Sequence, residues 1–435
     1  MKPTFDRSGL TGPKGDNSED VGTSHSAFRN PLSSIACNPQ SEIRIPQSEI
    51  RNPQSEIRNP KLPAGIYVHL PFCTTKCNYC DFTTALFDER TAQRYLAALL
   101  EEIDRIELGE NAPSADTIYF GGGTPSLVPE QFIQEILTAL AQRFSIHQDS
   151  EITLEMNPSP AESSRVASYR ALGVNRLSIG VQSFDDRELS DMTRAHTASQ
   201  ARQAVTDAAR KGFENLSLDL ILGLPGQTAR SFARSLQIAV SLPIRHLSVY
   251  ILELHNGTPL HAEVMSQKTK LPSDDFVADQ YREIVGLLES NGLFQYEISN
   301  FSRAGFQSRH NLKYWTRCPY IGFGVSSHSY DGSKRWNNTA SLSRYLRQIE
   351  SGLSPREAEN VVTETDAARE QLFLGLRMRR GVAVTALNAL AAGNHRLLQR
   401  WRFFCEQGWV EEKDGYCRLT TDGYLMSNEI LSELM

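Results

Sequence analysis

From about residue 65 onward, short apolar segments alternate with amphipathic ones, and this alternation constrains the fold more than any other feature. Strand-like segments precede helix-like segments in six consecutive units. Such repetition predicts an α/β fold in which parallel strands are joined by right-handed helical crossovers. A barrel-like sheet of this kind places its active site at the carboxyl ends of the strands. The expected strands are 66–70, 117–120, 152–155, 176–181, 216–222 and 246–252, and the expected helices are 90–108, 129–144, 163–172, 200–211 and 229–240.

Three cysteines follow the first expected strand with the spacing C-x3-C-x2-C, namely Cys73, Cys77 and Cys80. Three thiolates can bind three irons of a [4Fe–4S] cluster and leave the fourth iron open, whereas ferredoxin-type carriers fill all four positions with cysteine. An open metal position allows a small molecule to bind, as it does in catalytic zinc sites. A structural zinc site without a visible fourth ligand is the alternative that the spacing leaves open.

Polar or glycine-rich residues also lie at the ends of the following strands. Each of them alone is typical of a turn, but their position on one rim favours a binding site. Glycine lets the backbone approach a ligand closely. The carboxylates suit ammonium or ribose hydroxyl groups, and the amide and guanidinium suit a carboxylate or ribose, which together fit a zwitterionic nucleoside such as S-adenosylmethionine. The residues are the Gly-Gly-Gly-Thr-Pro run at 121–125, Glu155, Gln182, Arg194 and Asp219.

The cysteine run and the Gly-Gly-Gly-Thr-Pro turn together resemble the radical S-adenosylmethionine superfamily. Further blocks are similar to the anaerobic coproporphyrinogen III oxidase family, and within it to the heme chaperone branch. The resemblance covers residues 63–435 and implies a partial (β/α)6 barrel of the TIM type with a small winged-helix-like α+β domain after it. The blocks are Tyr67-Val-His-Leu-Pro-Phe-Cys73, Leu177-Ser-Ile-Gly-Val-Gln-Ser-Phe184, Asp219-Leu-Ile-Leu-Gly-Leu-Pro-Gly-Gln227 and Tyr296-Glu-Ile-Ser-Asn-Phe301.

The resemblance implies a set of cofactor-binding residues. The three cysteines would bind the cluster, and S-adenosylmethionine would bind the fourth iron through its amino and carboxylate groups. The radical chemistry then belongs to the cofactor, and the protein supplies position and exclusion of water. His69, beside the cysteine loop, either lines the site or is a hydrogen-bonded structural histidine. The positions that match the family around S-adenosylmethionine are Tyr67, Tyr79, Gly122, Gly123, Thr124, Glu155, Gln182, Arg194 and Asp219.

Two positions favour the heme chaperone branch over the oxidase branch. The oxidase branch typically has a further cysteine where this chain has Phe82, and the chaperone branch has the motif matched by His310-Asn-Leu-Lys-Tyr-Trp315. An imidazole can bind heme iron, so His310 is the candidate heme ligand, and His328 is a second candidate heme contact. The alternative is that His310 caps a loop while the aromatic residues pack in the core. Val325-Ser-Ser327 stands where the chaperone branch commonly has Pro-Gly-Ala, and the oxidase branch has a similar Gly-Val-Ser sequence there.

The expected function is therefore that of a heme chaperone, which binds heme and a [4Fe–4S] cluster with S-adenosylmethionine and transfers heme to an acceptor protein. The alternative is an enzyme, an oxygen-independent coproporphyrinogen III oxidase. The expected partners are heme, an acceptor protein and an electron donor for the cluster, and the resemblance also implies a homodimer.

Composition limits the remaining classes. A formal charge of −6 argues against nucleic-acid binding. The chain contains no apolar run of 18 residues, so no membrane span is predicted. The first residues contain no apolar signal segment, and seven cysteines are an odd and low count, which favours a reducing compartment. We therefore expect a cytoplasmic protein.

Four segments are expected along the chain. Residues 1–62 form a disordered tail with a seven-residue repeat, in which a proline in every copy prevents a continuous helix. Residues 63–300 form the barrel, and residues 301–360 form an extension that carries the His310 motif. Residues 361–435 form the winged-helix-like domain, in which Arg377-Met-Arg-Arg380 is either a solvated basic face or a carboxylate clamp, for example for porphyrin propionates.

Overall fold

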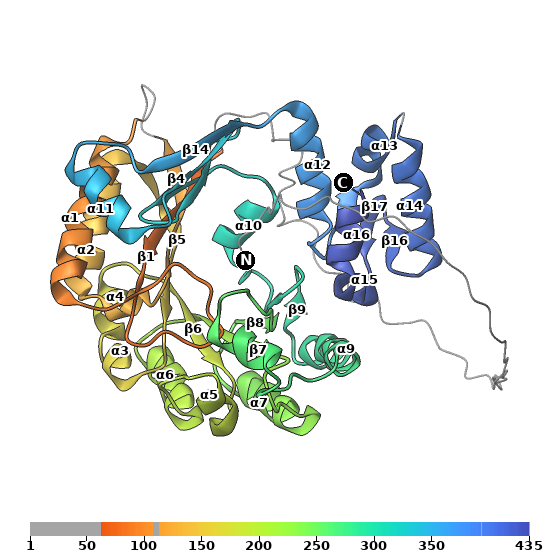
Figure 1. Ribbon diagram of the computed structural model, residues 1–435, viewed down its shortest axis with the longest axis horizontal. Helices are drawn as coiled ribbons and strands as arrows, with labels where there is room; N and C mark the ends of the chain where they lie inside the picture. Colours follow the sequence, from red (N-terminus) through yellow and green to blue (C-terminus); the bar gives the residue numbers. More distant parts are fainter. Residues whose placement is uncertain (1–61, 108–112, 393, 435) are drawn as a thin grey trace. The chain divides into compact units, whose positions relative to one another are not determined.

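The computed structural model describes residues 62–107, 113–392 and 394–434 (Figure 1). The chain divides into two units, Met1–Arg51 and Asn52–Met435, and the described residues all belong to the second. The expected disordered tail therefore lies outside the described residues, apart from Leu62. Within the described ranges, no helix has both the length and the apolar character that crossing a membrane requires.

A mixed sheet of twelve strands forms the centre of this unit. Its seven middle strands are parallel, in the order β11, β1, β4, β5, β6, β7 and β8. Antiparallel strands extend it on both sides, with β10 and β9 beyond β8, and β12, β13 and β14 beyond β11. Among the described strands, the two edges β14 and β9 do not pair, so the barrel is open. The bounds are β1 Ala64–Leu70, β4 Ser114–Gly122, β5 Ser145–Met156, β6 Arg176–Gln182, β7 Asn215–Leu222, β8 His246–Ile251, β9 Phe294–Gln295, β10 Asn300–Ser302, β11 Tyr320–Phe323, β12 His328–Tyr330, β13 Lys334–Asn338 and β14 Arg356–Val361.

The partial parallel barrel predicted from the sequence is confirmed, because all six expected strands are present in one sheet. The seventh parallel strand, β11, was not predicted. It pairs with β1 at Ile66 and Ile321, two residues far apart in the chain, and such a pairing leaves no local pattern. The proposed boundary at residue 300 stays a prediction, although β11 to β14 join the same sheet.

Amphipathic helices cover the outer face of the sheet (Figure 1). The first of them, α1, begins after Asp88, whose side chain accepts a hydrogen bond from Thr91 N, and it buries Tyr95, Leu99 and Ile103 at helical spacing. The expected helix 163–172 is divided at Arg165 into two short helices, and Ser159 caps the first of these. The bounds are α1 Glu89–Arg105, α2 Glu130–Arg143, α3 Pro160–Ser164, α4 Val166–Ala171, α5 Asp186–Asp191, α6 Ala198–Arg210, α7 Ala229–Ser241, α8 Pro259–Met265, α9 Asp274–Ser290, α10 Arg309–Trp315 and α11 Leu342–Glu350.

The glycine-rich turn after β11 is held by backbone hydrogen bonds to α1. Gly324 N donates to Glu102 Oε2 at 2.8 Å, and Val325 N donates to the Tyr95 hydroxyl at 3.0 Å. Ser326, where the chaperone branch commonly has glycine, has a φ of 58°, in the left-handed region that glycine favours. The turn therefore has a glycine-like backbone conformation without a glycine at this position.

The segment after β14 forms a small α+β module. It follows the order helix α12, strand β15, helices α13 and α14, then the hairpin β16–β17, and its three strands pair antiparallel in the order β15, β17, β16. This order is that of a winged helix, as the sequence predicted. Trp401, Phe404 and Leu419 are buried in its core. The bounds are α12 Glu364–Gly375, β15 Val382–Ala383, α13 Val384–Ala391, α14 His395–Glu406, β16 Val410–Lys413, β17 Tyr416–Leu419, α15 Thr421–Leu425 and α16 Ser427–Leu434.

Candidate functional site at the carboxyl ends of the parallel strands

The three cysteines of the C-x3-C-x2-C run lie in a loop that begins just beyond the carboxyl end of β1. Two short strands, β2 (Phe72–Cys73) and β3 (Ala85–Leu86), pair in parallel and hold its ends together. Inside the loop, Asn78 donates to the Asp191 carbonyl at 2.9 Å, and its own carbonyl accepts from Leu260 N at 2.9 Å. The loop is thus fixed to the barrel from several sides, and all three thiols are free.

Two of the three thiols accept hydrogen bonds from residues that the sequence assigned to S-adenosylmethionine. Thr124 Oγ1 donates to Cys73 Sγ at 3.6 Å, and Arg194 Nη1 donates to Cys77 Sγ at 3.5 Å. Burial raises the pKa of Cys73, and it raises that of Cys80 to about 11. Iron binding to these thiols would therefore release protons, because a metal-bound cysteine is a thiolate.

Arg194 connects the cysteine loop to the ends of β5 and β6. Its Nη2 donates to Asn157 Oδ1 at 2.5 Å and to the Gly180 carbonyl at 2.6 Å. Asn157 in turn donates to Thr124 Oγ1 at 2.8 Å. Arg194 Nε is a buried donor without a hydrogen-bond partner among the described residues, which fits a guanidinium that also serves an anionic ligand group. Tyr79 also lies beside this guanidinium.

The turn after β4 needs glycines because its backbone packs closely against His69 and Phe72. A Cβ atom on Gly123 would lie 2.6 Å from the Phe72 carbonyl oxygen, and one on Gly122 would lie 2.7 Å from the His69 ring. Gly122 also has a φ of 118°. The turn therefore lies directly against the start of the cysteine loop, and Gly123 N donates to the Leu70 carbonyl at 2.8 Å.

Two carboxylates complete this end of the barrel, one from β5 and one from β7, the strands on either side of β6. Glu155, near the end of β5, accepts from the Tyr119 hydroxyl at 2.7 Å and from Gly122 N at 3.2 Å. Burial raises its pKa to about 7. Asp219 lies within β7 and accepts from Ser178 Oγ at 3.3 and 3.2 Å, and burial also raises its pKa. Buried carboxylates with raised pKa values gain from a cationic ligand, because its charge favours their ionised form.

Gln182 ends β6 at an irregularity in the pairing with β7, and it has a φ of 67°. Such bulges change the direction of a side chain, and they are common next to binding sites. Asn157, Tyr119 and Ser178 were not assigned from the sequence. Asn157 lies in the Glu155-Met-Asn-Pro158 block, and the other two occupy the alternating strand positions that share a face with assigned residues. This period of two was the signal available for them.

The side chains of Tyr67 and His69, both on β1, connect the sheet to the cysteine loop. The Tyr67 hydroxyl and His69 Nδ1 are 3.0 Å apart, and His69 Nε2 lies 3.0 Å from the Thr83 carbonyl oxygen, at the far end of the loop. His69 thus has hydrogen-bond partners on both nitrogens, which corresponds to the structural alternative for this residue. It connects a strand of the barrel to the segment that follows the cysteines.

His310 lies away from the cysteine loop, in the amino-terminal half of the strands. Helix α10 is on the inner side of the sheet (Figure 1), and a Cβ on Gly65, near the start of β1, would lie 3.2 Å from the His310 ring. His310 Nδ1 is 2.9 Å from Thr117 Oγ1, and Nε2 is 2.8 Å from the Tyr314 hydroxyl. Burial lowers its pKa to about 3, so the imidazole is neutral. Both nitrogens therefore already have partners, and iron coordination would require one partner to move.

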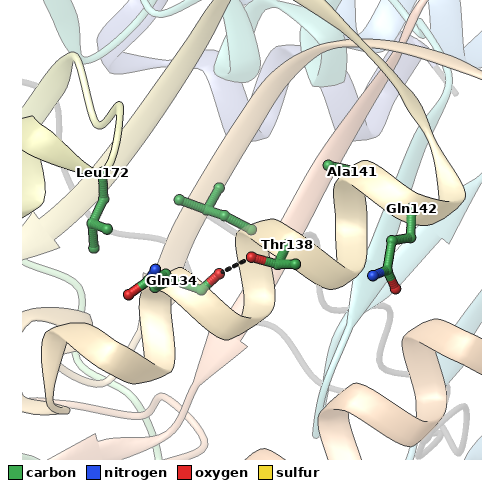
Figure 2. Close-up of a pocket in the computed structure, with 6 residues that line it drawn as sticks. Gln134, Thr138, Ala141, Gln142 and Leu172 are labelled. Atoms are coloured by element: carbon green, nitrogen blue, oxygen red, sulfur yellow. Dashed lines mark hydrogen bonds between the residues drawn. The ribbon is translucent and has the colours of Figure 1, made fainter.

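A surface hollow on α2 is unrelated to this site. It measures about 410 Å³ and lies on the outer face of α2, where its lining includes Gln134, Thr138 and Leu172 (Figure 2). None of the residues that line it is titratable or metal-binding. This hollow carries no indication of function.

Comparisons with known proteins identify the family. The radical SAM superfamily profile matches residues 67–239. The chain is 34% identical over 376 residues to the heme chaperone HemW of Bacillus subtilis, an alignment that covers 85% of this chain and 98% of that protein. This chain belongs to the HemW family. It is also 36% identical over 331 residues to the Bos taurus radical S-adenosyl methionine domain-containing protein 1, mitochondrial, which covers 75% of this chain and 71% of the relative.

A solved structure agrees with the fold of this HemW family member. The coproporphyrinogen III oxidase HemN from Escherichia coli, a radical SAM enzyme, matches with a TM-score of 0.75 and 25% identity, over 88% of this chain and 92% of HemN. Membership of the radical SAM superfamily decides for a [4Fe–4S] cluster and S-adenosylmethionine over the zinc alternative. Among the described residues, no three His, Cys, Asp or Glu side chains lie close enough together to bind a single metal ion. A cluster does not require this, because each cysteine binds a different iron.

Proposed function

We propose that this HemW family member is a heme chaperone that binds a [4Fe–4S] cluster with S-adenosylmethionine and delivers heme to an acceptor protein. The observation that carries the proposal is the alignment with a heme chaperone over 98% of that protein's length. Phe82, in place of the oxidase branch's further cysteine, and the His310-Asn-Leu-Lys-Tyr-Trp315 motif support the same choice.

The residues at the strand ends supply position and charge in this proposal. Cys73, Cys77 and Cys80 would bind the cluster, and a bound cluster would supply an electron for the reductive chemistry of S-adenosylmethionine. Glu155 is placed to bind the ammonium group, since its carboxylate is buried and gains from a positive partner. Arg194 faces the Cys77 sulfur and keeps a free Nε for an anionic group of the same ligand.

Seven more residues are assigned to the S-adenosylmethionine side of the site in the same proposal. Gly122 and Gly123 allow the backbone to approach the cofactor, since a Cβ on Gly122 would meet the His69 ring and one on Gly123 the backbone of Phe72. The remaining contacts come from the strand ends and the barrel interior. They are Tyr67, Tyr79, Thr124, Gln182 and Asp219.

The experiment that tests the proposal is a product assay combined with a transfer assay. Purified, anaerobically reconstituted protein is incubated with coproporphyrinogen III, reductant and S-adenosylmethionine, and separately with heme and an apo-hemoprotein. We expect no protoporphyrinogen IX and a transfer of heme to the acceptor. Formation of protoporphyrinogen IX would establish the alternative, an oxygen-independent coproporphyrinogen III oxidase, the activity of the structurally related HemN.

The partners follow from the same proposal. Delivery of heme requires an acceptor protein, and reduction of the cluster requires an electron donor of low potential. We place the protein in the cytoplasm, where thiols stay reduced, and infer a homodimer from the family resemblance. Size-exclusion chromatography with light scattering, with and without the cluster, measures the oligomeric state.

A further inference from the structure

Helix α10 ends at Trp315, and Trp315 lies beside Arg377, in the segment that follows α12. The central carbon of the Arg377 guanidinium is 6.0 Å from the centre of the Trp315 ring and 4.7 Å from that of Phe373. The basic run at 377–380 and the His-Asn-x-x-Tyr-Trp motif, separate in the sequence, therefore meet in space.

Two hydrogen-bond donors at this contact have no partner. Arg377 Nε and Trp315 Nε1 are both buried atoms without a hydrogen-bond partner among the described residues. A buried donor that stays unpaired is unfavourable, because it has lost its hydrogen bond to water. Two such donors from separate elements, next to each other, indicate a place where an acceptor from a ligand binds.

The backbone fixes Arg377 to the edge of the barrel sheet. Ile298 N donates to the Arg377 carbonyl at 2.9 Å, and Arg379 N donates to the Tyr296 carbonyl at 3.0 Å. Glu297 forms a bridge with Met378 between these two bonds. The backbone of Arg377 is therefore held against the turn between β9 and β10 by hydrogen bonds that do not involve its side chain.

The charges nearest to Arg377 leave its guanidinium available. They are Glu253 and Glu297, and neither forms an ion pair with Arg377 within the described part of the chain. Glu297 is fully buried, and burial raises its pKa to about 7, so it is only partly ionised at neutral pH. An arginine with these neighbours retains the capacity to bind a ligand carboxylate.

Glu253 also connects this place to the cysteine loop. It follows the carboxyl end of β8 and lies 3.7 Å from His255 Nε2, whose Nδ1 is 3.4 Å from Asp81, the residue after Cys80. Arg377 therefore lies near the same rim as the proposed cluster, in contrast to His310.

We propose that Arg377, together with the Trp315 indole N–H, binds a propionate carboxylate of heme. The inference rests on the proposed heme chaperone function and names the contact that recognises the anionic edge of the porphyrin. The planar guanidinium matches a carboxylate with paired donors, and Trp315 and Phe373 supply apolar surface beside it. Loss of one charge-assisted contact corresponds to about a tenfold or greater loss of affinity.

The test is a titration of the reconstituted full chain with ferric heme, followed by Soret absorbance, and a parallel titration with the dimethyl ester of the same heme. The variants are Arg377→Gln and Trp315→Phe. The matched control is Arg380→Gln, which removes a charge from the same run, where Arg380 lies 4.7 Å from the Tyr416 ring. Circular dichroism and iron content show that each variant is folded and loaded.

We expect Arg377→Gln to weaken heme binding about tenfold, Trp315→Phe to weaken it less, and Arg380→Gln to leave it unchanged. The dimethyl ester should bind the wild type and Arg377→Gln equally. If the wild type binds heme and Arg377→Gln binds it with the same affinity, the propionate contact is wrong while the chaperone function stands. If the wild type does not bind heme, the proposed function itself fails. Should Arg377→Gln not fold, Trp315→Phe replaces it as the test. A ratio of heme affinity to ester affinity below that of the wild type supports the propionate contact, and an unchanged ratio contradicts it.

Discussion

The cysteine loop and helix α10 are the two regions whose motifs stand out in the sequence, and the structure treats them differently. At the loop, three thiols and the Nε of Arg194 are available to a ligand. In α10, both nitrogens of His310 have partners within 3.0 Å, and the ring is buried. The two ends of one helix therefore differ in what they offer a ligand, since Trp315 at the end of α10 keeps an unpaired donor whereas both nitrogens of His310 have partners.

The largest effect is expected at the cysteine loop. Cys77→Ala should abolish cluster assembly, since three thiolates are the minimum that holds a four-iron cluster with one open iron. Iron and sulfide analysis after anaerobic reconstitution measures this. Cys318→Ala is the matched control, because Cys318 is also a free, partly buried thiol but lies outside the loop. Equal iron content in the two variants would contradict the assignment.

The second prediction concerns the interior of the barrel. His310→Ala should lower the free energy of unfolding by about 3 kcal/mol, because it leaves a cavity and unpaired hydroxyl groups on Thr117 and Tyr314. Tyr314→Phe removes one of these hydrogen bonds and should cost about 1 kcal/mol. Denaturant unfolding measures both values.

The same pair of variants also tests whether His310 binds heme iron, which stays a prediction. Tyr314→Phe frees the Nε2 nitrogen, so an iron-binding His310 would bind heme more tightly in this variant and would lose its heme spectrum in His310→Ala. If heme binds more tightly to Tyr314→Phe and more weakly to His310→Ala than to the wild type, His310 is a ligand of the heme iron. Helix α10 and the cysteine loop would then both offer ligand-binding side chains.

The third prediction is a pH dependence at the strand-end rim. Glu155 has a pKa raised to about 7 by burial, so its carboxylate is mostly protonated at pH 6 and mostly ionised at pH 8. If it binds the ammonium group of S-adenosylmethionine, affinity should rise about tenfold between these two pH values. Isothermal titration across this range measures the effect, and Glu155→Gln should give weak, pH-independent binding. An unchanged pH profile in this variant would exclude the contact.

The stability of the ligand-free protein should change in the opposite direction. A carboxyl whose folded pKa is raised binds more protons in the folded than in the unfolded state between about pH 4.5 and pH 7. Glu155 and Glu297 both have this property, so their ionisation lowers stability as the pH rises through this window. Thermal unfolding of wild type and Glu155→Gln should therefore differ more at pH 8 than at pH 5.

Sequence reasoning found the rim because its residues belong to short local blocks, each at the end of a strand. The assigned residues are connected by hydrogen bonds, as expected for one rim. Thr124 donates to Cys73, and Asn157 links Thr124 to Arg194. Glu155 accepts from the backbone of Gly122, in the same turn as Thr124. It did not find β11 as a parallel partner of β1 or the contact between Trp315 and Arg377. Both depend on chain segments distant in sequence, and neither produces a periodic pattern that a local window detects.

The turn at Gly324 has a consequence for how sequences of this family are compared. Its shape is maintained by Glu102 and Tyr95, which bind its backbone, and Ser326 adopts the conformation that a glycine would take. A residue with a side chain can therefore stand at 326 while the turn persists, whereas Ser327 helps to hold the turn because its Oγ donates to the Gly324 carbonyl at 2.8 Å. Serine in place of glycine at 326 is thus poor evidence for assigning a relative to the oxidase or the chaperone branch.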